Sequence, residues 1–395
     1  METHTKVVTA SATGTAAEAA AKLVADLKRD LAGEVPALVM VFASTQQPLG
    51  EVAAPLAAAF ADAQVLGAST AGEFTERGET KGAVCAVAIA GAFKVYSGIG
   101  SGVKAQPERA VARALEGLPR AVAGYPYRTG ILLVDTMAGN CEEVALIAAG
   151  ELGADEPLVG GAAGDDLKMV STFVSCGAHA ANDALVLAQI FSKAPLGLGV
   201  HHGHRPLSAP LRVTKAHGNL VEQIEGRPAW DVWREATRDA AKLQGIDVDA
   251  LAAADETTFL LRFEAGLAAG AEYKIRAPLS RTAEGAISFA CGVPEGAVIR
   301  ITESTPKDQI DSAREAARRA NAKLGGRPAA GAIVFDCICR NLILNAEFGS
   351  AVRAMVEELG NVPLAGFETY GEIALDAGDM SGFHNTTSVV LAFPR

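Results

Sequence analysis

Two side chains near the C-terminal end of this 395-residue chain have the clearest chemistry. Arg340 carries a planar guanidinium that can hold a carboxylate through two parallel hydrogen bonds, and Glu372 can pair with an ammonium group. Together they suit a zwitterionic ligand of the amino-acid type. The alternative is that Arg340 and Glu372 form a salt bridge with each other, which would leave neither group for a ligand.

Four further residues complete this predicted C-terminal ligand site. Tyr370 would form an aromatic wall, and Asn385 would supply an amide. Gly371 stands directly before Glu372 and indicates a sharp turn of the backbone. Cys337 is either a reactive thiol or a small buried residue at the end of a strand.

A glycine followed six residues later by an acid occurs three times, each time between two apolar runs. The pairs are Gly67 with Glu73, Gly160 with Asp166, and Gly366 with Glu372. The second copy is imperfect, because its inner glycine comes one residue early and Asp replaces Glu. Three copies of one spacing predict three superposable units with the acids in equivalent loops.

The elements around these loops predict an α/β fold. Each unit reads as strand, helix, strand, helix, loop and strand, and the continuous apolar runs are typical of buried parallel strands. We expect the first unit to begin with the strand at 6–11, the second with the strand at 94–102, and the third with the strand at 297–304.

A different region precedes the third unit and sets the predicted domain boundary. Residues 212–225 read as a β-hairpin, because the Gly and Asn at its turn tolerate a positive φ. We therefore predict two layered α/β domains with mixed sheets: an N-terminal domain of two units over 1–209, and a C-terminal domain over 210–395 that contains the hairpin region and the third unit.

Polar side chains also follow the buried strands of the first two units. Ser44, Thr45 and Asp135 stand at predicted carboxyl ends of strands, where α/β sheets bind their ligands. With Glu73 and Asp166 they form the N-terminal part of the predicted site. We expect the principal site in the C-terminal domain, because only that repeat combines a cationic fork, an aromatic ring, a carboxylate and an amide.

Charge and apolar runs argue against several classes of partner. The 46 acidic residues outnumber the 35 Lys and Arg residues, which leaves a net charge of −11 and no basic cluster for nucleic acid. No apolar run is long enough to span a bilayer, and the first residues lack the apolar core of a secretory signal, so we expect a cytoplasmic protein without membrane insertion. Six scattered cysteines include no CxxC pair, so neither disulfides nor a metal site is predicted.

Several segments resemble the FIST family, in which an N-terminal FIST domain is followed by a FIST C-terminal domain. They are FASTQ at 42–46, GASTAGE at 67–73, LVGGAAGDD at 158–166, CICR at 337–340, GFETYGEI at 366–373 and HNTT at 384–387. The resemblance covers nearly the whole chain. It implies a bacterial sensory protein of signal transduction that binds a small ligand such as an amino acid.

The resemblance also implies a partner protein. Because no output segment is visible, a signal would pass to a separate histidine kinase of a two-component system or to a cyclase, and a homo-oligomer is left open. Some free-standing members of the family are similar to haem-binding nitric-oxide sensors that act on histidine kinases. We expect no cofactor, with haem as the alternative, and no spacing selects an axial ligand among the seven histidines.

An enzyme is the remaining class. Cys337, His384 and Glu372 form a conceivable set of nucleophile, base and acid for a hydrolase or transferase. The sequence contains no GxSxG elbow, no P-loop and no dinucleotide GxGxxG after a strand. We therefore expect a binding protein and no enzyme.

Overall fold

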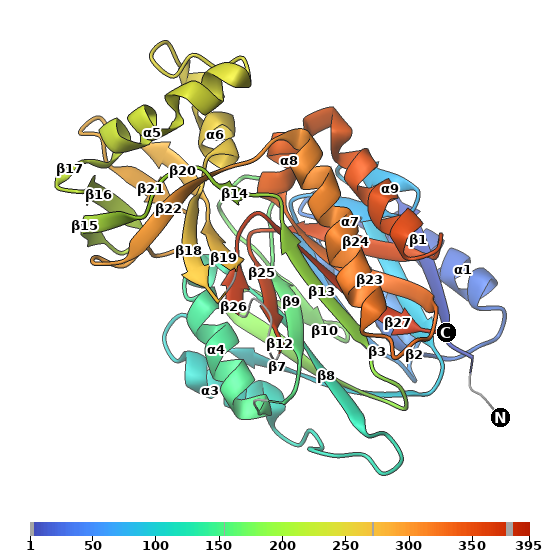
Figure 1. Cartoon of the computed structure of the whole chain (residues 1–395). Helices are drawn as coiled ribbons and strands as arrows, with labels where there is room; N and C mark the ends of the chain where they lie inside the picture. Colours follow the sequence, from blue (N-terminus) through green and yellow to red (C-terminus); the bar gives the residue numbers. More distant parts are fainter. Residues whose placement is uncertain (1–3, 154, 271, 377–381) are drawn as a thin grey trace.

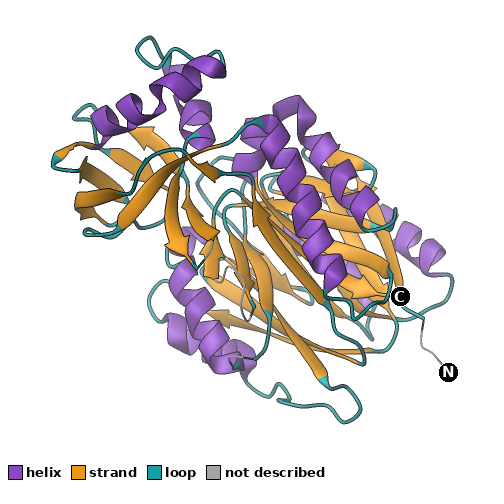
Figure 2. Ribbon diagram, viewed as in Figure 1, coloured by secondary structure: helices purple, strands orange, loops and turns teal. Residues whose placement is uncertain are grey.

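The computed structural model describes residues 4–153, 155–270, 272–376 and 382–395. Three units form the body of the molecule, and a smaller inserted domain projects from one side (Figure 1). Helices cover the outer faces of the sheets, and the strands meet in the middle of the body (Figure 2). The α/β class with mixed sheets predicted from the sequence is confirmed.

Each unit has a four-stranded core, helices on one face and a short hairpin. Unit 1 comprises β1 (Lys6–Ala12), α1 (Ala16–Leu31), β2 (Pro36–Ser44), α2 (Leu49–Ala59), β3 (Gln64–Thr70), β4 (Glu73–Thr75), β5 (Gly78–Thr80) and β6 (Val84–Ala90). Unit 2 comprises β7 (Phe93–Ser101), α3 (Pro107–Leu115), β8 (Tyr127–Val134), α4 (Cys141–Leu152), β9 (Leu158–Ala162), β10 (Val174–Cys176), β11 (His179–Ala181) and β12 (Ala184–Ser192). Unit 3 comprises β13 (Gly197–His202), α7 (Pro306–Ala322), β23 (Ala329–Cys337), α8 (Ile338–Leu344), α9 (Phe348–Glu358), β24 (Leu364–Thr369), β25 (Glu372–Leu375), β26 (Gly382–His384) and β27 (Thr387–Pro394).

The three units share one strand order and exchange their hairpins. The cores are β1-β6-β2-β3, β7-β12-β8-β9 and β13-β27-β23-β24, and the last two strands of each core are parallel. The hairpin β4–β5 of unit 1 joins the sheet of unit 3, β25–β26 of unit 3 joins unit 2, and β10–β11 of unit 2 joins unit 1. The exchange closes a ring, so each unit needs another to complete its sheet.

The strand register confirms that the three predicted glycines are equivalent. The second residue of each incoming hairpin pairs with one of them: Phe74 with Gly366, Ile373 with Gly160, and Ser175 with Gly67. A Cβ at Gly160 would lie 1.8 Å from the carbonyl oxygen of Leu132. Close approach to the neighbouring backbone therefore explains the glycine at this point of the sheet.

The acids that follow these glycines are equivalent in only two units. Glu73 and Glu372 are the first residues of β4 and β25. In unit 2 the corresponding strand begins at Val174, eight residues after Asp166 (174 minus 166). The prediction of a shared position for Asp166 is wrong, because the longer connection keeps it in a loop.

Unit 3 begins at β13 and not at the predicted strand over 297–304. β13 pairs with β27, and a Cβ at Gly199 would lie 1.9 Å from the carbonyl oxygen of Ala316 in α7. Unit 2 has the same close contact, since a Cβ at Gly100 would lie 1.8 Å from the carbonyl oxygen of Ala110 in α3. The run at 297–304 does form a strand, β22 (Val298–Glu303), but β22 pairs with β15 and β18 of the inserted domain.

The inserted domain separates β13 from α7. It comprises β14 (Arg205–Pro206), β15 (Leu211–His217), β16 (Leu220–Ile224), β17 (Arg227–Pro228), α5 (Ala229–Leu243), α6 (Ala253–Arg262), β18 (Ala265–Ala269), β19 (Glu272–Arg276), β20 (Pro278–Arg281), β21 (Ile287–Phe289) and β22. The predicted hairpin is confirmed, because β15 and β16 pair through a turn in which Gly218 has a φ of 60°. The domain has its own core, with Trp233, Phe259 and Phe289 buried under α5 and α6.

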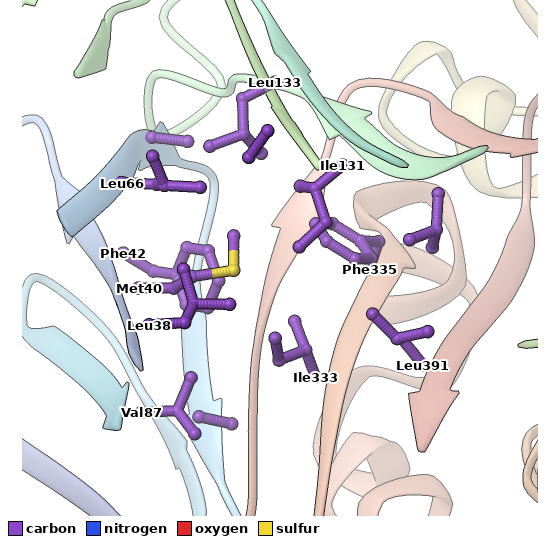
Figure 3. Packing of buried hydrophobic residues seen from close by; sticks show 14 of the residues in the cluster. Leu38, Met40, Phe42, Leu66, Val87, Ile131, Leu133, Ile333, Phe335 and Leu391 are labelled. Carbon is purple, nitrogen blue, oxygen red and sulfur yellow. The ribbon is translucent and has the colours of Figure 1, made fainter. Parts of the chain in front are cut away.

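A single apolar core joins the inner faces of the three sheets. Leu38 and Phe42 of unit 1 meet Ile131 of unit 2 and Phe335 and Leu391 of unit 3 (Figure 3). Each unit also buries its helices on the outer face of its own sheet. Burial on both faces explains why these strands read as continuous apolar runs.

Local signals define where the longer helices begin. Thr15 and Glu18 form a reciprocal capping box at the start of α1, and Thr305 and Asp308 do the same for α7. Among the residues that the structure describes, no helix has the length and apolarity required to cross a membrane.

Candidate functional site

The predicted site residues separate into two groups in space. Cys337, Arg340, Glu372 and Asn385 lie in unit 3 next to the inserted domain, and each is almost fully buried. The second group surrounds the loop after β9, where units 1, 2 and 3 meet. Its members are Ser44, Thr45, Asp166 and Tyr370, with Glu73 nearby.

The guanidinium group of Arg340 contacts other residues of unit 3 through all three of its nitrogens. Its Nε lies 2.5 Å from Asp336 Oδ1, and Nη1 donates to Gln309 Oε1 at 2.5 Å and to Ser312 Oγ at 2.6 Å. Nη2 donates to the carbonyl oxygen of Gln309 at 2.9 Å. The alternative salt bridge between Arg340 and Glu372 is therefore wrong, because Asp336 is the partner. A ligand carboxylate would have to displace these bonds.

Glu372 and Glu73 accept equivalent hydrogen bonds in units 3 and 1. The hydroxyl of Thr369 and the N–H of Thr387 donate to Glu372, the latter at 3.2 Å. In unit 1 the hydroxyl of Thr70 and the N–H of Ala83, at 3.4 Å, donate to Glu73. Burial raises the pKa of Glu73 from its ordinary value of 4.5 to about 8 and raises the pKa of Glu372 well above that value.

Asp135 is the counterpart of these two glutamates in unit 2. It accepts from the hydroxyl of Thr172 and, at 2.5 Å, from the N–H of Asp183. Each of the three acids thus binds a threonine hydroxyl and an N–H at the start of the last strand of its unit. Sequence reasoning missed this match, because Asp135 reaches the position from the end of β8 rather than from the loop.

Cys337 and Asn385 lie at the boundary with the inserted domain. Burial raises the pKa of the Cys337 thiol well above its usual range, which disfavours the thiolate that a nucleophile requires. Asn385 accepts from the N–H of Ala277 at 3.3 Å and donates to Cys291 Sγ at 3.5 Å. Asn385 therefore links the last hairpin of unit 3 to the inserted domain.

The predicted residues of unit 1 do meet Asp166. Its Oδ2 accepts from Ser44 Oγ at 3.0 Å, from the N–H of Thr45 at 3.0 Å and from Thr45 Oγ1 at 2.5 Å. Lys168 Nζ lies 3.4 Å from the same oxygen and donates to Thr45 Oγ1 at 2.7 Å. A carboxylate, an ammonium group and two hydroxyls therefore converge at the carboxyl end of β2.

Tyr370 clamps the loop that carries Asp166. Its hydroxyl donates to Asp165 Oδ1 at 2.6 Å and accepts from the N–H of Leu167 at 2.8 Å. The Asp165 carboxylate also accepts from the N–H groups of the three residues at 169–171, at distances from 2.6 to 3.0 Å. Burial alone would raise the pKa of Asp165, but these hydrogen bonds outweigh burial and lower it.

The loop holds an uncommon backbone conformation. Asp166, Leu167 and Met169 all have a positive φ, between 54° and 62°. The hydrogen bonds to Asp165 and Tyr370 offset the cost of this conformation. In this conformation Leu167, Met169 and Val170 are 48%, 56% and 77% exposed to solvent.

A pocket of about 310 Å³ opens beside Thr45. It is lined by Thr45, Gln47, Pro48, Leu49, Gly50, Ser69, Phe173 and Ala180. It therefore lies at the carboxyl ends of β2 and β3, against the first turn of α2. A pocket of about 320 Å³ lies at the opposite end of unit 1 beside Pro36, where no predicted site residue is found.

The helix end in this pocket has unfilled hydrogen-bonding capacity. No side chain caps the N-terminus of α2, whose N-cap residue is Pro48. The first N–H groups of a helix have no intrahelical acceptor, and their dipole favours an anion. Gln47 is buried, and its Oε1 accepts no hydrogen bond. The pocket thus offers both donors and an acceptor to a ligand.

Comparison with known proteins identifies the family. Residues 37–227 match the FIST N domain model, and residues 229–375 match the FIST C domain model. The chain belongs to the FIST family. FIST domains are associated with sensing in signal transduction. The change from one model to the other falls inside the inserted domain, at the start of α5.

The curated relatives carry no assigned function. An uncharacterized protein of Mycobacterium bovis is 32% identical over 205 residues, which cover 49% of each chain. An uncharacterized protein of Methanocaldococcus jannaschii is 28% identical over 114 residues, 29% of this chain and 22% of that one. The chain spans about half the length, or less, of these relatives.

The buried histidines offer little room for a haem group. His204 and His384 have almost no exposed surface, and His204 Nδ1 lies 3.2 Å from Thr302 Oγ1. Burial lowers the pKa of His202 to about 4 and that of His384 to about 3. An axial ligand needs an open face for the macrocycle, so these three residues do not fit a haem in this conformation.

Proposed function

We propose that this FIST protein is a sensory protein that binds an amino-acid-like molecule in the pocket of unit 1 and reports occupancy to a separate partner, a histidine kinase or a cyclase. One observation carries the proposal. The pocket of about 310 Å³ is lined by the first turn of α2, whose N-terminus carries no side-chain cap among the described residues, and by Thr45, which donates to Asp166. The N–H groups at the start of α2 could donate to a ligand carboxylate, and Asp166 could accept from its ammonium group.

The carboxylate of the ligand would bind the first turn of α2. The N–H groups of Leu49 and Gly50 belong to the turn whose donors have no intrahelical acceptor. Both residues line the pocket, as does the hydroxyl-bearing Thr45. Charge-assisted hydrogen bonds to such N–H groups are stronger than neutral ones, so the anionic end of the ligand is the main anchor.

The ammonium group would bind Asp166 in place of Lys168. The Lys168 side chain is 51% exposed, and its Nζ is 3.4 Å from the carboxylate. An exposed ion pair of this kind contributes little free energy, so a ligand can displace it at low cost. Asp166 stays oriented after the exchange, because Ser44 and Thr45 continue to donate to it.

The side chain of the ligand would contact apolar atoms. Leu49, Phe173 and Ala180 line the pocket between its polar ends. The volume is at the small end of the range for ligand sites, about 300 to 1,000 Å³. A small or medium-sized amino acid is therefore a better match than a nucleotide.

Occupancy would reach a partner through the loop after β9. Phe173 contacts the pocket, and the same loop carries the exposed Leu167, Met169 and Val170. Tyr370 ties the loop to unit 3. A ligand that shifts Phe173 or Asp166 would change the surface that a partner can read.

Calorimetry with single amino acids on the purified full chain tests the proposal. We expect Asp166→Asn to weaken binding roughly tenfold to a hundredfold, because it removes the charge that holds the ammonium group. Lys168→Met should leave binding unchanged or tighten it, since Lys168 competes with the ligand for Asp166.

Variants of the C-terminal group serve as controls. Glu372→Gln replaces a buried carboxyl group outside the pocket with an amide of similar shape, so the variant should bind the ligand as the parent does. If Glu372→Gln abolishes binding while Asp166→Asn retains it, the ligand site lies in unit 3, as the sequence predicts. If no amino acid binds the folded parent, the proposed ligand class is wrong.

A further inference from the structure

A second group of charges lies between the inserted domain and unit 2, away from the proposed ligand pocket. Lys274 and Arg276 on β19 face Glu142 in the first turn of α4, and β19 lies beside β26 and α4 (Figure 1). Arg276 Nη2 donates to Glu142 Oε1 at 2.6 Å, and Lys274 Nζ is 3.7 Å from the same oxygen. Two cations share one carboxylate, so the described residues of this group carry one more positive than negative charge.

The buried members of the group have unfilled hydrogen-bonding capacity. Arg276 is only 3% exposed, and its Nη1 donates to the carbonyl oxygen of Phe383 at 3.1 Å. Among the residues that the structure describes, its Nε has no acceptor. A buried guanidinium with an unused donor is destabilising unless a further acceptor is present. An anion would supply that acceptor.

The local field is positive. Burial lowers the pKa of Lys274, and the charge of the neighbouring Arg276 lowers it further. The opposing effect of the Glu142 charge, which raises this pKa, is smaller than the effect of Arg276. Lys274 and Arg276 also help to lower the pKa of His384. The two cations therefore repel each other, and a bound anion would relieve this repulsion.

Solvent reaches the group from outside. The side chains of Lys274 and Glu142 are 20% and 36% exposed, and Cys291 is partly exposed. Asn385 Nδ2 donates to Cys291 Sγ at 3.5 Å, so the buried Asn385 lies next to this partly exposed cysteine. A Cβ at Gly382 would come within 2.5 Å of Lys274 Nζ, so the glycine leaves space for the ammonium group.

We propose that this charged group is an anion site that takes a small carboxylate or phosphate group and joins the inserted domain to unit 2. The anion accepts from Lys274 Nζ and from Arg276, while Glu142 competes with it for both cations. Lys274 and Arg276 belong to the inserted domain and Glu142 belongs to α4, so occupancy changes how firmly β19 is held against the body. The inference is independent of the pocket in unit 1.

Titration calorimetry of the full chain with inorganic phosphate and with malonate tests the site, at an ionic strength held constant with sodium chloride. We expect Lys274→Gln to weaken binding roughly tenfold to a hundredfold. Glu142→Gln should tighten binding, because it removes the competing carboxylate. Glu143→Gln is the matched control on the same helix turn, since Glu143 is exposed and forms no contact with either cation.

Alkylation by N-ethylmaleimide gives a readout that does not depend on calorimetry. A bound anion should slow modification of Cys291 and leave modification of Cys176 unchanged, because Cys176 is also partly exposed but lies on β10. Binding of phosphate alone, or of malonate alone, identifies which group the site prefers. If neither anion binds, or if Lys274→Gln and Glu142→Gln bind both as the parent does, the charged group is only a structural ion pair.

Discussion

The connection after β24 in unit 3 and the connection after β9 in unit 2 start from equivalent strands but use their acids in opposite ways. After β24, Glu372 is fully buried and holds Thr369 and the start of β27. After β9, the chain runs through 163–173 before its exchanged strand begins, whereas only 370–371 separate β24 from β25, and Asp166 stays partly exposed next to Lys168. The same sequence spacing therefore yields a structural acid in one unit and an accessible charge in another.

The difference shows that burial decides what a carboxylate can do. In the buried position the neutral form is favoured, so Glu372 stabilises the loop through hydrogen bonds rather than through charge. Asp166 keeps solvent access and a cation close by. The cationic fork, the carboxyl group and the amide of the predicted C-terminal site, Arg340, Glu372 and Asn385, are thus enclosed in the fold.

Among the predicted substitutions, Arg340→Ala is expected to change the stability of the protein most. The substitution leaves Asp336 as a buried carboxylate without its cation, a change that typically costs about 3 to 5 kcal/mol. Urea unfolding of the full chain measures the loss. Arg238→Ala removes an exposed arginine paired with Asp249 and should change stability little. Equal stability of the two variants would show that the interior of unit 3 is more solvated than its burial indicates.

The buried acid Glu73 should give the stability of the protein a pH dependence. Since the pKa of Glu73 is raised from 4.5 to about 8, the folded state keeps a proton that the unfolded chain releases in this window. Stability is therefore highest below the window and falls as the pH rises through it, by at most about 1.4 kcal/mol per pH unit for one group.

Glu73→Gln should flatten this part of the profile, because the amide does not titrate. Free energies of unfolding measured from about pH 5 to about pH 8 give the slope for parent and variant. An unchanged slope in Glu73→Gln would show that Glu73 is ionised in the folded protein.

A smaller effect is expected for Tyr370→Phe. The variant keeps the ring but loses the hydroxyl contacts with Asp165 and the N–H of Leu167. Each hydrogen bond contributes about 0.5 to 1.5 kcal/mol. Limited proteolysis should cleave the loop at 166–173 faster than in the parent, while global unfolding shifts only modestly. Identical cleavage rates would show that Asp165 alone holds the loop.

The smallest expected effect concerns haem. We expect no stoichiometric Soret band when haem is added to the purified chain, because the buried His204 and His384 have no open face. An absorption spectrum and single His→Ala variants provide the measurement. A band that one such variant abolishes would support the nitric-oxide sensor alternative.

The sequence by itself determined the elements and their repetition. The apolar runs became strands because each is buried by the central core on one face and by helices on the other. Gly67, Gly160 and Gly366 occur where an incoming hairpin pairs with the sheet. A Cβ would meet the backbone of the neighbouring strand at Gly160 and Gly366, and the side chains of Ser175 and Val41 at Gly67. These features are local or periodic, so a single chain reveals them.

The tertiary structure decided which residues meet. The exchange of hairpins brings Tyr370 of unit 3 to Asp165 of unit 2, and Asp166 to Ser44 of unit 1. The structure also shows that β13, and not the strand at 297–304, begins unit 3. The sequence could not reveal this, because the pairing of two strands across a long insertion leaves no local signal. Arg340 forms an ion pair with Asp336, four residues earlier, because β23 ends directly before α8 begins and both side chains are buried at this junction. Contacts between distant segments depend on packing, which spacing along the chain does not specify.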